Sequence, residues 1–221
     1  MDSFVVIVAG GSGSRMASDV PKQFLELDSK PILMHTLERL YSITPNSNFI
    51  LVLPKNQFGY WNTLCENHRF KLKHVLVEGG HSRFQSVKNG LCKISANSMV
   101  AIHDGVRPFI AKNIFESCMQ EAKISGAAIP VLAISDSIRE ISKNGSQIRD
   151  RNLFVSVQTP QCFQSDIILE SYQQDFDSSF TDDASVVESK GHEISLVKGN
   201  KENIKITTPE DLNIALTFIN R

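Results

Sequence analysis

The stretch that decides the fold is Phe4-Val5-Val6-Ile7-Val8-Ala9-Gly10-Gly11-Ser12-Gly13-Ser14-Arg15-Met16. Its first six residues are continuously apolar, which is typical of a parallel strand buried on both faces. Glycines and small polar residues follow at once, and glycine lets backbone N–H groups approach phosphate oxygens closely. The stretch therefore predicts a sheet whose first strand ends in a loop able to bind an anion.

The loop matches neither of two common nucleotide-binding templates. A dinucleotide fingerprint requires a glycine three residues after Gly13, where this chain has Met16. A Walker A loop ends in Gly-Lys followed by Ser or Thr, and this loop has no such ending. Its cations are Arg15 and, a little further on, Lys22. Taken alone, the loop is either a phosphate-binding element or a plain turn with solvated charges.

Strand-like and helix-like segments alternate along the next hundred or so residues. Strands are expected over 49–53, 74–77, 99–102 and 127–132, and helices from about Pro31, around 60–64, over 82–94 and over about 112–123. This alternation predicts an α/β fold, with a mostly parallel, Rossmann-like sheet and helices on both faces. Helices from about Asp166 and Asp182, a strand over 193–197 and a closing helix from Pro209 complete the chain.

The alternation breaks after residue 132. Two β-compatible runs, 134–142 and 148–157, flank an Asn-Gly pair, which is the strongest short hairpin signal. No helical pattern follows that could cover this polar hairpin, so 134–157 is expected to be a protruding arm, either an exposed flap or a contact for a partner subunit. Because the chain has no repeat or low-complexity linker, 1–221 is expected to form one domain carrying that arm.

Composition excludes some classes of protein. The 221 residues include 23 Lys and Arg against 24 Asp and Glu, a net charge of −1, which argues against nucleic-acid binding through a bulk basic field. The apolar run 4–9 is far shorter than the ~20 residues that span a bilayer. It also follows Asp2 rather than a basic segment, so it does not resemble a signal peptide. The chain is expected to be cytoplasmic and away from membranes.

The cysteines and histidines do not predict a metal site. The four cysteines lie far apart without a C-x-x-C motif, so they are expected to be reduced thiols. Cys65, His68 and His74 lie within ten residues of one another, but no fourth ligand has sensible zinc spacing.

The segment His103-Asp104-Gly105-Val106-Arg107-Pro108 follows a predicted strand. Ligands of open α/β sheets bind outside the carboxyl ends of the strands. A carboxylate can accept hydrogen bonds from hydroxyls, and a guanidinium can grip a phosphate through two hydrogen bonds, so this pair suits a hydroxylated, anionic ligand. The alternative is a local ion pair. His103 could act as a base, although a structural role beside the sheet is expected.

Three further segments carry candidate site residues. A Gly-Gly turn at 79–80 opens a helix whose free N–H groups could bind a base or a phosphate. Lys205 is flanked by isoleucines on an expected strand, just before a helix capped by Thr207 or Thr208. The third segment is Thr181-Asp182-Asp183. Several cations, glycine-rich backbone donors and the lack of a Ser, Cys and His triad suit phosphoryl or nucleotidyl transfer, where catalysis is mainly positioning and charge stabilisation.

Together these motifs resemble those of the sugar-phosphate cytidylyltransferases. The matching segments occur in the same order over essentially the whole chain: 9–16 with 21–24, 103–108, 158–161, 181–182 and 203–207. The resemblance implies a CTP-dependent nucleotidyltransferase in which a sugar-alcohol phosphate attacks the α-phosphorus of CTP and pyrophosphate leaves. A phosphate monoester is already largely dianionic near neutral pH, so this reaction needs no general base.

The resemblance also implies a role for individual residues. Those expected to act in catalysis are Arg15, Lys22 and Lys205. Those expected to bind CTP are Ala9, Gly10, Gly11, Gly13, Gly79, Gly80, Arg83, Ser86 and Gly105. Those expected to bind the sugar phosphate are Asp104, Arg107, Ser137, Arg151 and Thr181. Mg²⁺ would be held mainly by the CTP phosphates, and the arm would carry Arg151 into the site of a partner in a homodimer.

Three functions remain open on the sequence. Overall similarity favours 2-C-methyl-D-erythritol 4-phosphate of the non-mevalonate isoprenoid pathway as the substrate, and ribitol 5-phosphate is the alternative within the same chemistry. The third is a non-catalytic nucleotide-binding subunit, against which the joint presence of the cations and Asp104 argues. The chain departs from the usual family pattern at Ser137, where a threonine is usual, and at His81, where an acidic residue is often found.

Overall fold

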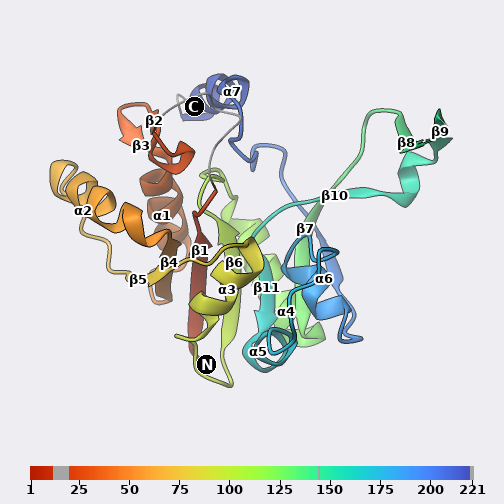
Figure 1. The fold of residues 1–221 in the computed structure, drawn as a ribbon, viewed down its shortest axis with the longest axis horizontal. Coiled ribbons are helices and arrows are strands. Elements are labelled where there is room, and N and C mark those ends of the chain that lie inside the picture. Colours follow the sequence, from red (N-terminus) through yellow and green to blue (C-terminus); the bar gives the residue numbers. More distant parts are fainter. Residues whose placement is uncertain (12–19, 144, 220–221) are drawn as a thin grey trace.

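The computed structural model of the chain describes residues 1–11, 20–143 and 145–219. Four parallel strands form the first half of the central sheet, in the order β6 (Met99–Asp104), β1 (Ser3–Val8), β4 (Asn48–Leu53) and β5 (Val75–Glu78) (Figure 1). Their carboxyl ends therefore meet at one edge of the sheet. The predicted first strand is confirmed as β1, at the centre of this parallel part.

The second half of the sheet is mixed. Strand β11 (Gln161–Gln164) lies antiparallel between β6 and β7 (Ala127–Ala133). Strand β10 (Val155–Val157) pairs antiparallel with β7, and β12 (Ser195–Lys198) pairs parallel with it. The sequence analysis missed β11, because this short strand follows a proline and has glutamine at both ends. It also took 148–157 as one β run, which is wrong, since a 3₁₀ turn (Arg151–Leu153) separates β10 from the hairpin.

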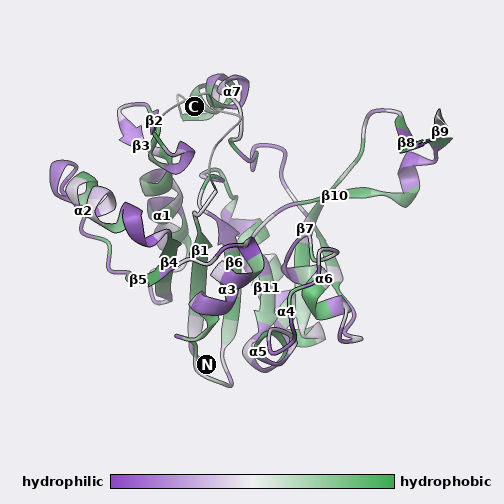
Figure 2. Ribbon diagram, viewed as in Figure 1, coloured by the Kyte–Doolittle hydropathy of each residue, from purple (hydrophilic) through white to green (hydrophobic). Residues whose placement is uncertain are grey.

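Helices cover both faces of the sheet, as the α/β prediction requires. Helices α1 (Ile32–Ile43), α2 (Phe58–Asn67) and α4 (Lys112–Ser125) pack on the face that receives Val5 and Ile7. Helices α3 (Arg83–Leu91), α5 (Ser165–Ser171) and α6 (Asp183–Glu188) pack on the face that receives Phe4 and Val6. Because successive strand side chains point to opposite faces, a continuously apolar strand supplies both layers of core. Figure 2 shows the apolar residues gathered in these central strands.

A third, smaller core lies beyond the carboxyl ends of the strands. Helix α7 (Pro209–Ile219) packs there with the short strands β2 (Glu26–Leu27) and β3 (Lys30–Pro31), and Leu27, Ile32 and Ile206 are fully buried in it. The segment before α7 was expected to be a strand, which is wrong, because its residues make no ladder. It is instead held by single bonds such as Ile206 N–H to the Val106 carbonyl, 3.0 Å. Thr208 caps α7 by accepting from Asp211 N–H at 3.3 Å.

The arm is a separate two-stranded sheet of β8 (Ile138–Ser142) and β9 (Gly145–Arg149) that projects away from the rest of the molecule (Figure 1). Arg139 lies opposite Ile148, and Ile141 lies opposite Ser146. Ile141 and Ile148 therefore share one face of the hairpin, where they are 85% and 71% exposed. Within the described residues, no helix has both the length and the apolar character needed to cross a membrane.

Candidate active site

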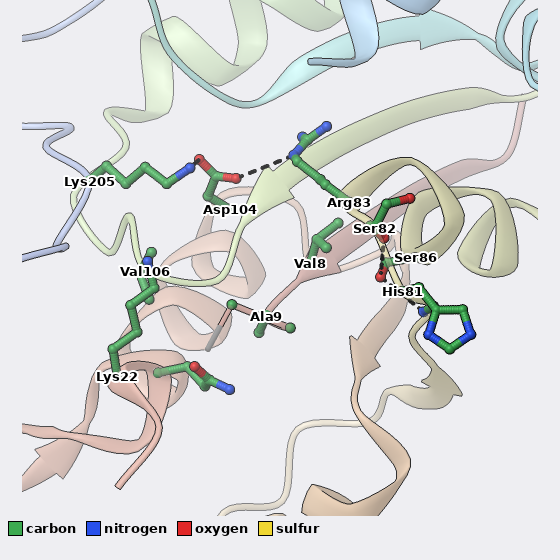
Figure 3. Close-up of a pocket in the computed structure, with 14 residues that line it drawn as sticks. Val8, Ala9, Lys22, His81, Ser82, Arg83, Ser86, Asp104, Val106 and Lys205 are labelled. Carbon is green, nitrogen blue, oxygen red and sulfur yellow. Dashed lines mark hydrogen bonds and ion pairs between the residues drawn. The ribbon is translucent and has the colours of Figure 1, made fainter. Parts of the chain in front are cut away.

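A cleft of about 210 Å³ lies at the carboxyl ends of the parallel strands (Figure 3). Three of its lining segments begin where a strand ends: β1 leads into Gly10 and Gly11, β5 into Gly80, and β6 ends at Asp104. Its lining residues are Val8, Ala9, Gly10, Gly11, Lys22, Gln23, Gly80, His81, Ser82, Arg83, Ser86, Asp104, Val106 and Lys205. Many of the residues expected from the sequence to bind CTP therefore gather in one cavity.

Asp104 is the acidic residue of this cleft, and three cations surround it. Its Oδ2 lies 3.0 Å from Arg107 Nε and 3.1 Å from Lys205 Nζ, and its Oδ1 lies 3.9 Å from Arg83 Nε. Figure 3 shows Lys205 and Arg83 approaching Asp104 from opposite sides. Burial alone would raise the pKa of Asp104, but Arg83, Lys205 and Arg107 together hold it well below its usual range. The carboxylate stays ionised, and the surrounding charge remains positive and suited to anions.

His103, the candidate base, is closed off from this cleft. Its Nε2–H donates to the Arg107 carbonyl at 2.9 Å, and its Nδ1 accepts from the Thr159 hydroxyl at 3.1 Å. The same hydroxyl oxygen accepts from Asp104 N–H at 3.1 Å. Burial lowers the pKa of His103 to about 4, so the ring is neutral at physiological pH. The expected structural role is confirmed, because His103 holds the loop that carries Asp104 and Arg107.

Lys22 enters the cleft from a short 3₁₀ turn (Lys22–Phe24) and passes over Gly11. A Cβ on Gly11 would lie 3.3 Å from Lys22 Cε, so the lysine stem already occupies the space above the glycine. Its ammonium faces the cleft from the side opposite Asp104 (Figure 3). The other two site residues expected in this loop, Arg15 and Gly13, lie outside the described residues.

The start of α3 forms the wall that faces β1. Ser82 caps the helix by accepting from Gln85 N–H at 3.0 Å. Ser86 Oγ accepts from Gly80 N–H at 3.0 Å and donates to the Ser82 carbonyl at 2.9 Å. These bonds fix the Gly-Gly turn against the helix and leave a rim of backbone at the cleft.

Two of the predicted CTP-binding glycines lie just behind the cleft wall. Gly79 N–H donates to the Leu53 carbonyl at 2.8 Å, and Gly105 N–H donates to the Val8 carbonyl at 3.0 Å. A Cβ on Gly105 would lie 2.7 Å from Ala9 Cβ, so only glycine allows the loops after β6 and β1 to approach this closely. These glycines hold the lining backbone in place.

A second cavity of about 280 Å³ adjoins the first. The two share Arg83, Asp104 and Lys205, and the second adds Arg107 and Thr181. Three of the predicted sugar-phosphate residues, Asp104, Arg107 and Thr181, therefore lie around one space beside the predicted nucleotide site.

Ser137 and Arg151, the other two predicted substrate residues, lie on the arm. Arg151 Nη1 donates to the Ser135 carbonyl within the arm itself. Neither residue lines the two cavities of its own chain. The arm thus separates these two residues from the other predicted substrate residues of the same chain.

The sequence analysis gave no role to several residues that build the site. Asp183 holds Arg83, Tyr172 donates a hydrogen bond to Asp183, and Gln158, Thr159 and Gln161 line the second cavity. One signal for Asp183 exists in the sequence: Asp182 and Ser185 have the spacing of a helix cap, and the structure has that reciprocal cap at α6. Nothing in the sequence pairs Asp183 with Arg83, which lies a hundred residues away.

The side chains that the structure describes do not form a metal cage. Within 1–11, 20–143 and 145–219, no three His, Cys, Asp or Glu side chains come together as such a cage would require. In the Cys65, His68 and His74 segment, His74 Nε2 instead accepts from Trp61 Nε1–H at 3.0 Å. Asp104, the carboxylate of the main cleft, already has three cationic partners.

Comparison with known proteins decides the family. Residues 3–221 match the family described as IspD, 2-C-methyl-D-erythritol 4-phosphate cytidylyltransferase. The chain belongs to this family. A cytidylyltransferase of that name from Phocaeicola vulgatus is 48% identical over 219 residues, covering 99% of this chain and all of the relative. One from Bacteroides fragilis is 48% identical over 214 residues, covering 97% of this chain and 98% of the relative.

Solved structures of the family have the same fold. The 2-C-methyl-D-erythritol 4-phosphate cytidylyltransferase of Thermus thermophilus superposes with a TM-score of 0.82 at 28% identity, covering all of both chains. The 4-diphosphocytidyl-2C-methyl-D-erythritol synthase of Anaerococcus prevotii gives 0.83 at 26% identity, covering all of this chain and 96% of the other. The resemblance drawn from the motifs is confirmed, as is the α/β fold with its β-hairpin.

Proposed function

We propose that this chain, as a member of the IspD family, transfers the cytidylyl group of CTP to 2-C-methyl-D-erythritol 4-phosphate. The products are 4-diphosphocytidyl-2-C-methyl-D-erythritol and pyrophosphate, a step of isoprenoid biosynthesis. The observation that carries the proposal is the Asp104 carboxylate, ringed by Arg83, Arg107 and Lys205 where two cavities meet. One cavity suits the nucleotide and the other the sugar phosphate. The ribitol 5-phosphate alternative is not favoured, because the family and its relatives carry the other name.

The reaction proceeds by displacement at the α-phosphorus. An oxygen of the substrate phosphate forms a bond to that phosphorus, and the bond from it to the oxygen bridging to the β-phosphate breaks, so that pyrophosphate leaves with the electron pair. No proton has to be removed from the attacking oxygen, which fits the enclosed and neutral His103. Catalysis then depends on positioning and on charge stabilisation.

Cations on opposite sides of the cleft would supply that stabilisation. Lys22 enters beside Gly10 and Gly11, where the triphosphate would lie, and Lys205 enters from the Asp104 side. We assign Lys22 to the charge that develops at the α-phosphorus and Lys205 to the same phosphate group. Arg15, from the loop after β1, is assigned to the triphosphate on the family resemblance.

The backbone around the start of α3 would hold the nucleoside. The rim from Ala9 to Gly11 faces the Gly80 turn across the cleft, and Ser86 fixes that turn through Gly80 N–H. A pyrimidine base needs a few polar groups at fixed positions, which such a rim supplies. Gly79 and Gly105 act by keeping the lining segments close.

The second cavity would hold the sugar phosphate. Arg107 and Lys205 present positive charge to its phosphate, and Asp104 and Thr181 can bond to hydroxyls. Since Arg83, Asp104 and Lys205 line both cavities, the attacking phosphate and the α-phosphorus would meet beside them.

A divalent cation fits this site if it arrives with the nucleotide. Mg²⁺ usually keeps several waters and is bound through substrate phosphates and one or two carboxylates, and Asp104 is already paired with cations. We propose that phosphate oxygens of CTP hold the ion, where it neutralises charge on the triphosphate. Lys22 and Lys205 act on the same charge from the protein side.

The chain would form one cytidylyltransferase domain, residues 1–221, with a dimerisation arm over 134–154, shorter than the expected 134–157 because Val155–Val157 pair with β7 in the central sheet. Support comes from Ile141 and Ile148, which lie exposed on one face of a hairpin that nothing in the described part of the chain covers. In a two-fold homodimer, each arm would bring Ser137 and Arg151 to the substrate cavity of the partner. Because CTP and a sugar phosphate are charged metabolites that do not diffuse through membranes, we place the enzyme in the cytoplasm, where it needs no nucleic-acid partner.

A pyrophosphate-release assay tests the function. The pure protein is given CTP, Mg²⁺ and either 2-C-methyl-D-erythritol 4-phosphate or ribitol 5-phosphate. We expect kcat/KM to be much larger with the first, by at least about a hundredfold, because a site that bonds specific hydroxyls discriminates strongly. Equal or reversed values would overturn the substrate assignment. CTP binding without pyrophosphate release with either phosphate would instead favour a non-catalytic subunit.

A further inference from the structure

An ion pair with a fully buried carboxylate lies behind the cleft, between Arg83 and Asp183. Arg83 Nη1 donates to Asp183 Oδ1 at 2.8 Å, and Nη2 donates to Oδ2 at 2.6 Å. Asp183 is fully buried and also accepts from the Tyr172 hydroxyl at 2.7 Å. Such a two-bond pair fixes the direction of the guanidinium as well as its position.

This pair ties together the two halves of the site. Arg83 is the first residue of α3 and lines both cavities. Asp183 is the first residue of α6, directly after Thr181 and Asp182, which line the cavity assigned to the sugar phosphate. It lines neither cavity itself, so its effect on a substrate has to pass through Arg83 or through the start of α6.

The start of α6 is anchored on its other side as well. Asp182 Oδ2 accepts from Gln161 Nε2 at 2.7 Å, and Gln161 Oε1 accepts from Ala184 N–H at 2.9 Å. These bonds hold α6 to strand β11 whether or not Arg83 is present. Loss of the pair would therefore release Arg83 more than it would move Thr181.

The direction of Arg83 matters for Asp104. With both Nη groups held by Asp183, Arg83 presents Nε to Asp104 Oδ1 at 3.9 Å (Figure 3). Asp104 Oδ2 remains with Arg107 and Lys205. A released guanidinium would turn its forked end toward Asp104 or toward a bound phosphate, because these are the nearest negative charges. Lys205 would then lose its place beside Asp104.

We propose that Asp183 is a positioning residue for cytidylyl transfer, which by holding Arg83 keeps Asp104 and Lys205 aligned between the two substrates. The inference rests on the proposed function and adds to it a residue that touches neither substrate. Tyr172 supports the same carboxylate from the far side. The competing role is a purely structural ion pair, which would stabilise the fold without affecting the reaction.

The variant Asp183→Asn separates these two roles, since it keeps the shape and removes the charge. We expect kcat to fall about 10- to 100-fold, as it does when reacting groups are slightly displaced, and the dissociation constant for CTP to rise by a smaller factor, since Arg83 also lines the nucleotide cavity. The matched control is Glu38→Gln on α1. It removes the charge of a carboxylate that pairs with Lys30 and lines neither cavity. Unchanged kcat in the folded Asp183→Asn enzyme, with only a lower melting temperature, would overturn the proposal.

A double variant tests whether Asp183 acts through Arg83. Arg83→Met lowers kcat by itself, and adding Asp183→Asn to it should lower kcat no further. If the two losses multiply, Asp183 works independently of Arg83 and the inference is wrong. If Asp183→Asn does not fold, Tyr172→Phe removes one bond to the same carboxylate and should lower kcat a few-fold with CTP binding unchanged; an unaltered kcat again overturns the proposal. Wild-type turnover is measured first, because an inactive wild type would mean that the proposed function itself fails.

Discussion

The charge cluster around Asp104 and the hairpin arm of β8 and β9 differ in how far the chain itself covers them. The Asp104 side chain is only 9% exposed, and Arg83, Arg107 and Lys205 of the same chain surround it. The arm exposes Ile141 and Ile148 by 85% and 71%. One chain therefore builds the centre of the site but leaves the two isoleucines of its arm in water.

The difference follows from what supports each region. The cluster stands on strand ends whose sheet has a core on both faces, so its side chains are fixed before any ligand arrives. The arm is a lone hairpin, and a two-stranded sheet is at best marginally stable in water. We therefore assign the chemistry to the rigid part and propose that the arm acts when a second copy covers it.

The largest expected effect is at the rigid cluster. Lys22→Ala should lower kcat by about 10²–10³ and change CTP binding much less, because a cation near the α-phosphorus gains interaction as charge develops in the transition state. Steady-state kinetics together with equilibrium binding of CTP would measure both quantities. The control is Lys112→Ala, which removes an exposed lysine of α4 paired with Glu116. If only the KM for CTP rose, Lys22 would be a ground-state binder and not a catalytic residue.

A smaller effect is expected at the arm. Ile148→Ala should weaken the dimer about tenfold. A buried methylene group is worth roughly 0.8 kcal/mol, and partial cover by the partner leaves a loss of about 0.7 kcal/mol at each of the two copies, or about 1.4 kcal/mol per dimer. The stability of the isolated monomer should change by less than about 0.5 kcal/mol, as for other exposed positions.

The matched control for the arm is Ile124→Ala, which truncates an isoleucine that is 75% exposed on α4. Analytical ultracentrifugation over a range of concentrations would compare both variants with the wild type. Equal dimer constants for all three proteins, or a wild type that stays monomeric, would refute the role given to the exposed isoleucines of the arm.

Much of the parallel half of the sheet, and of the site at its strand ends, could be predicted from the sequence. The run 4–9 is apolar at every position, and such a strand has few options other than the centre of a two-layered sheet, where β1 is found. Asp104 and Arg107 could be found because they follow a buried strand, and ligands gather at strand ends. Lys205 was found for its apolar neighbours, although its segment is held by single bonds and not by a ladder.

The rest depends on contacts between distant segments. Strand β11 is two apolar residues between two glutamines, and its burial comes from lying between β6 and β7. Asp183 looks like an ordinary first-turn residue of a helix, and its role appears only when Arg83 is placed opposite it. Local patterns report propensity and burial, whereas these features arise from tertiary pairing.

The smallest expected effect, a return of activity to about a quarter of wild type, gives the sharpest test of whether the arm enters the site of a partner. Arg151→Ala and Lys22→Ala homodimers should each be nearly inactive, because every site lacks one of the two residues. In a heterodimer of the two, the site that has the wild-type Lys22 also receives the wild-type Arg151 from the partner's arm, and the other site lacks both. Random exchange of equal amounts makes half of the dimers heterodimeric, with one good site in two, so activity should return to about a quarter of wild type.

The mixture has to be co-expressed, or unfolded and refolded together, and differential tags would establish that chains have exchanged. The reference is a mixture of Lys112→Ala and Lys22→Ala chains. Both chains keep wild-type Arg151, so each site is active or inactive according to its Lys22 alone. Activity should therefore be about half of wild type, whichever chain the arm serves. If exchange is established and the Arg151 mixture stays at the level of its parents, Arg151 acts within its own chain or not at all. The arm would then be a flap whose exposed isoleucines serve something other than the reaction. The Asp104 cluster and the arm would then no longer differ in whether they need a second chain.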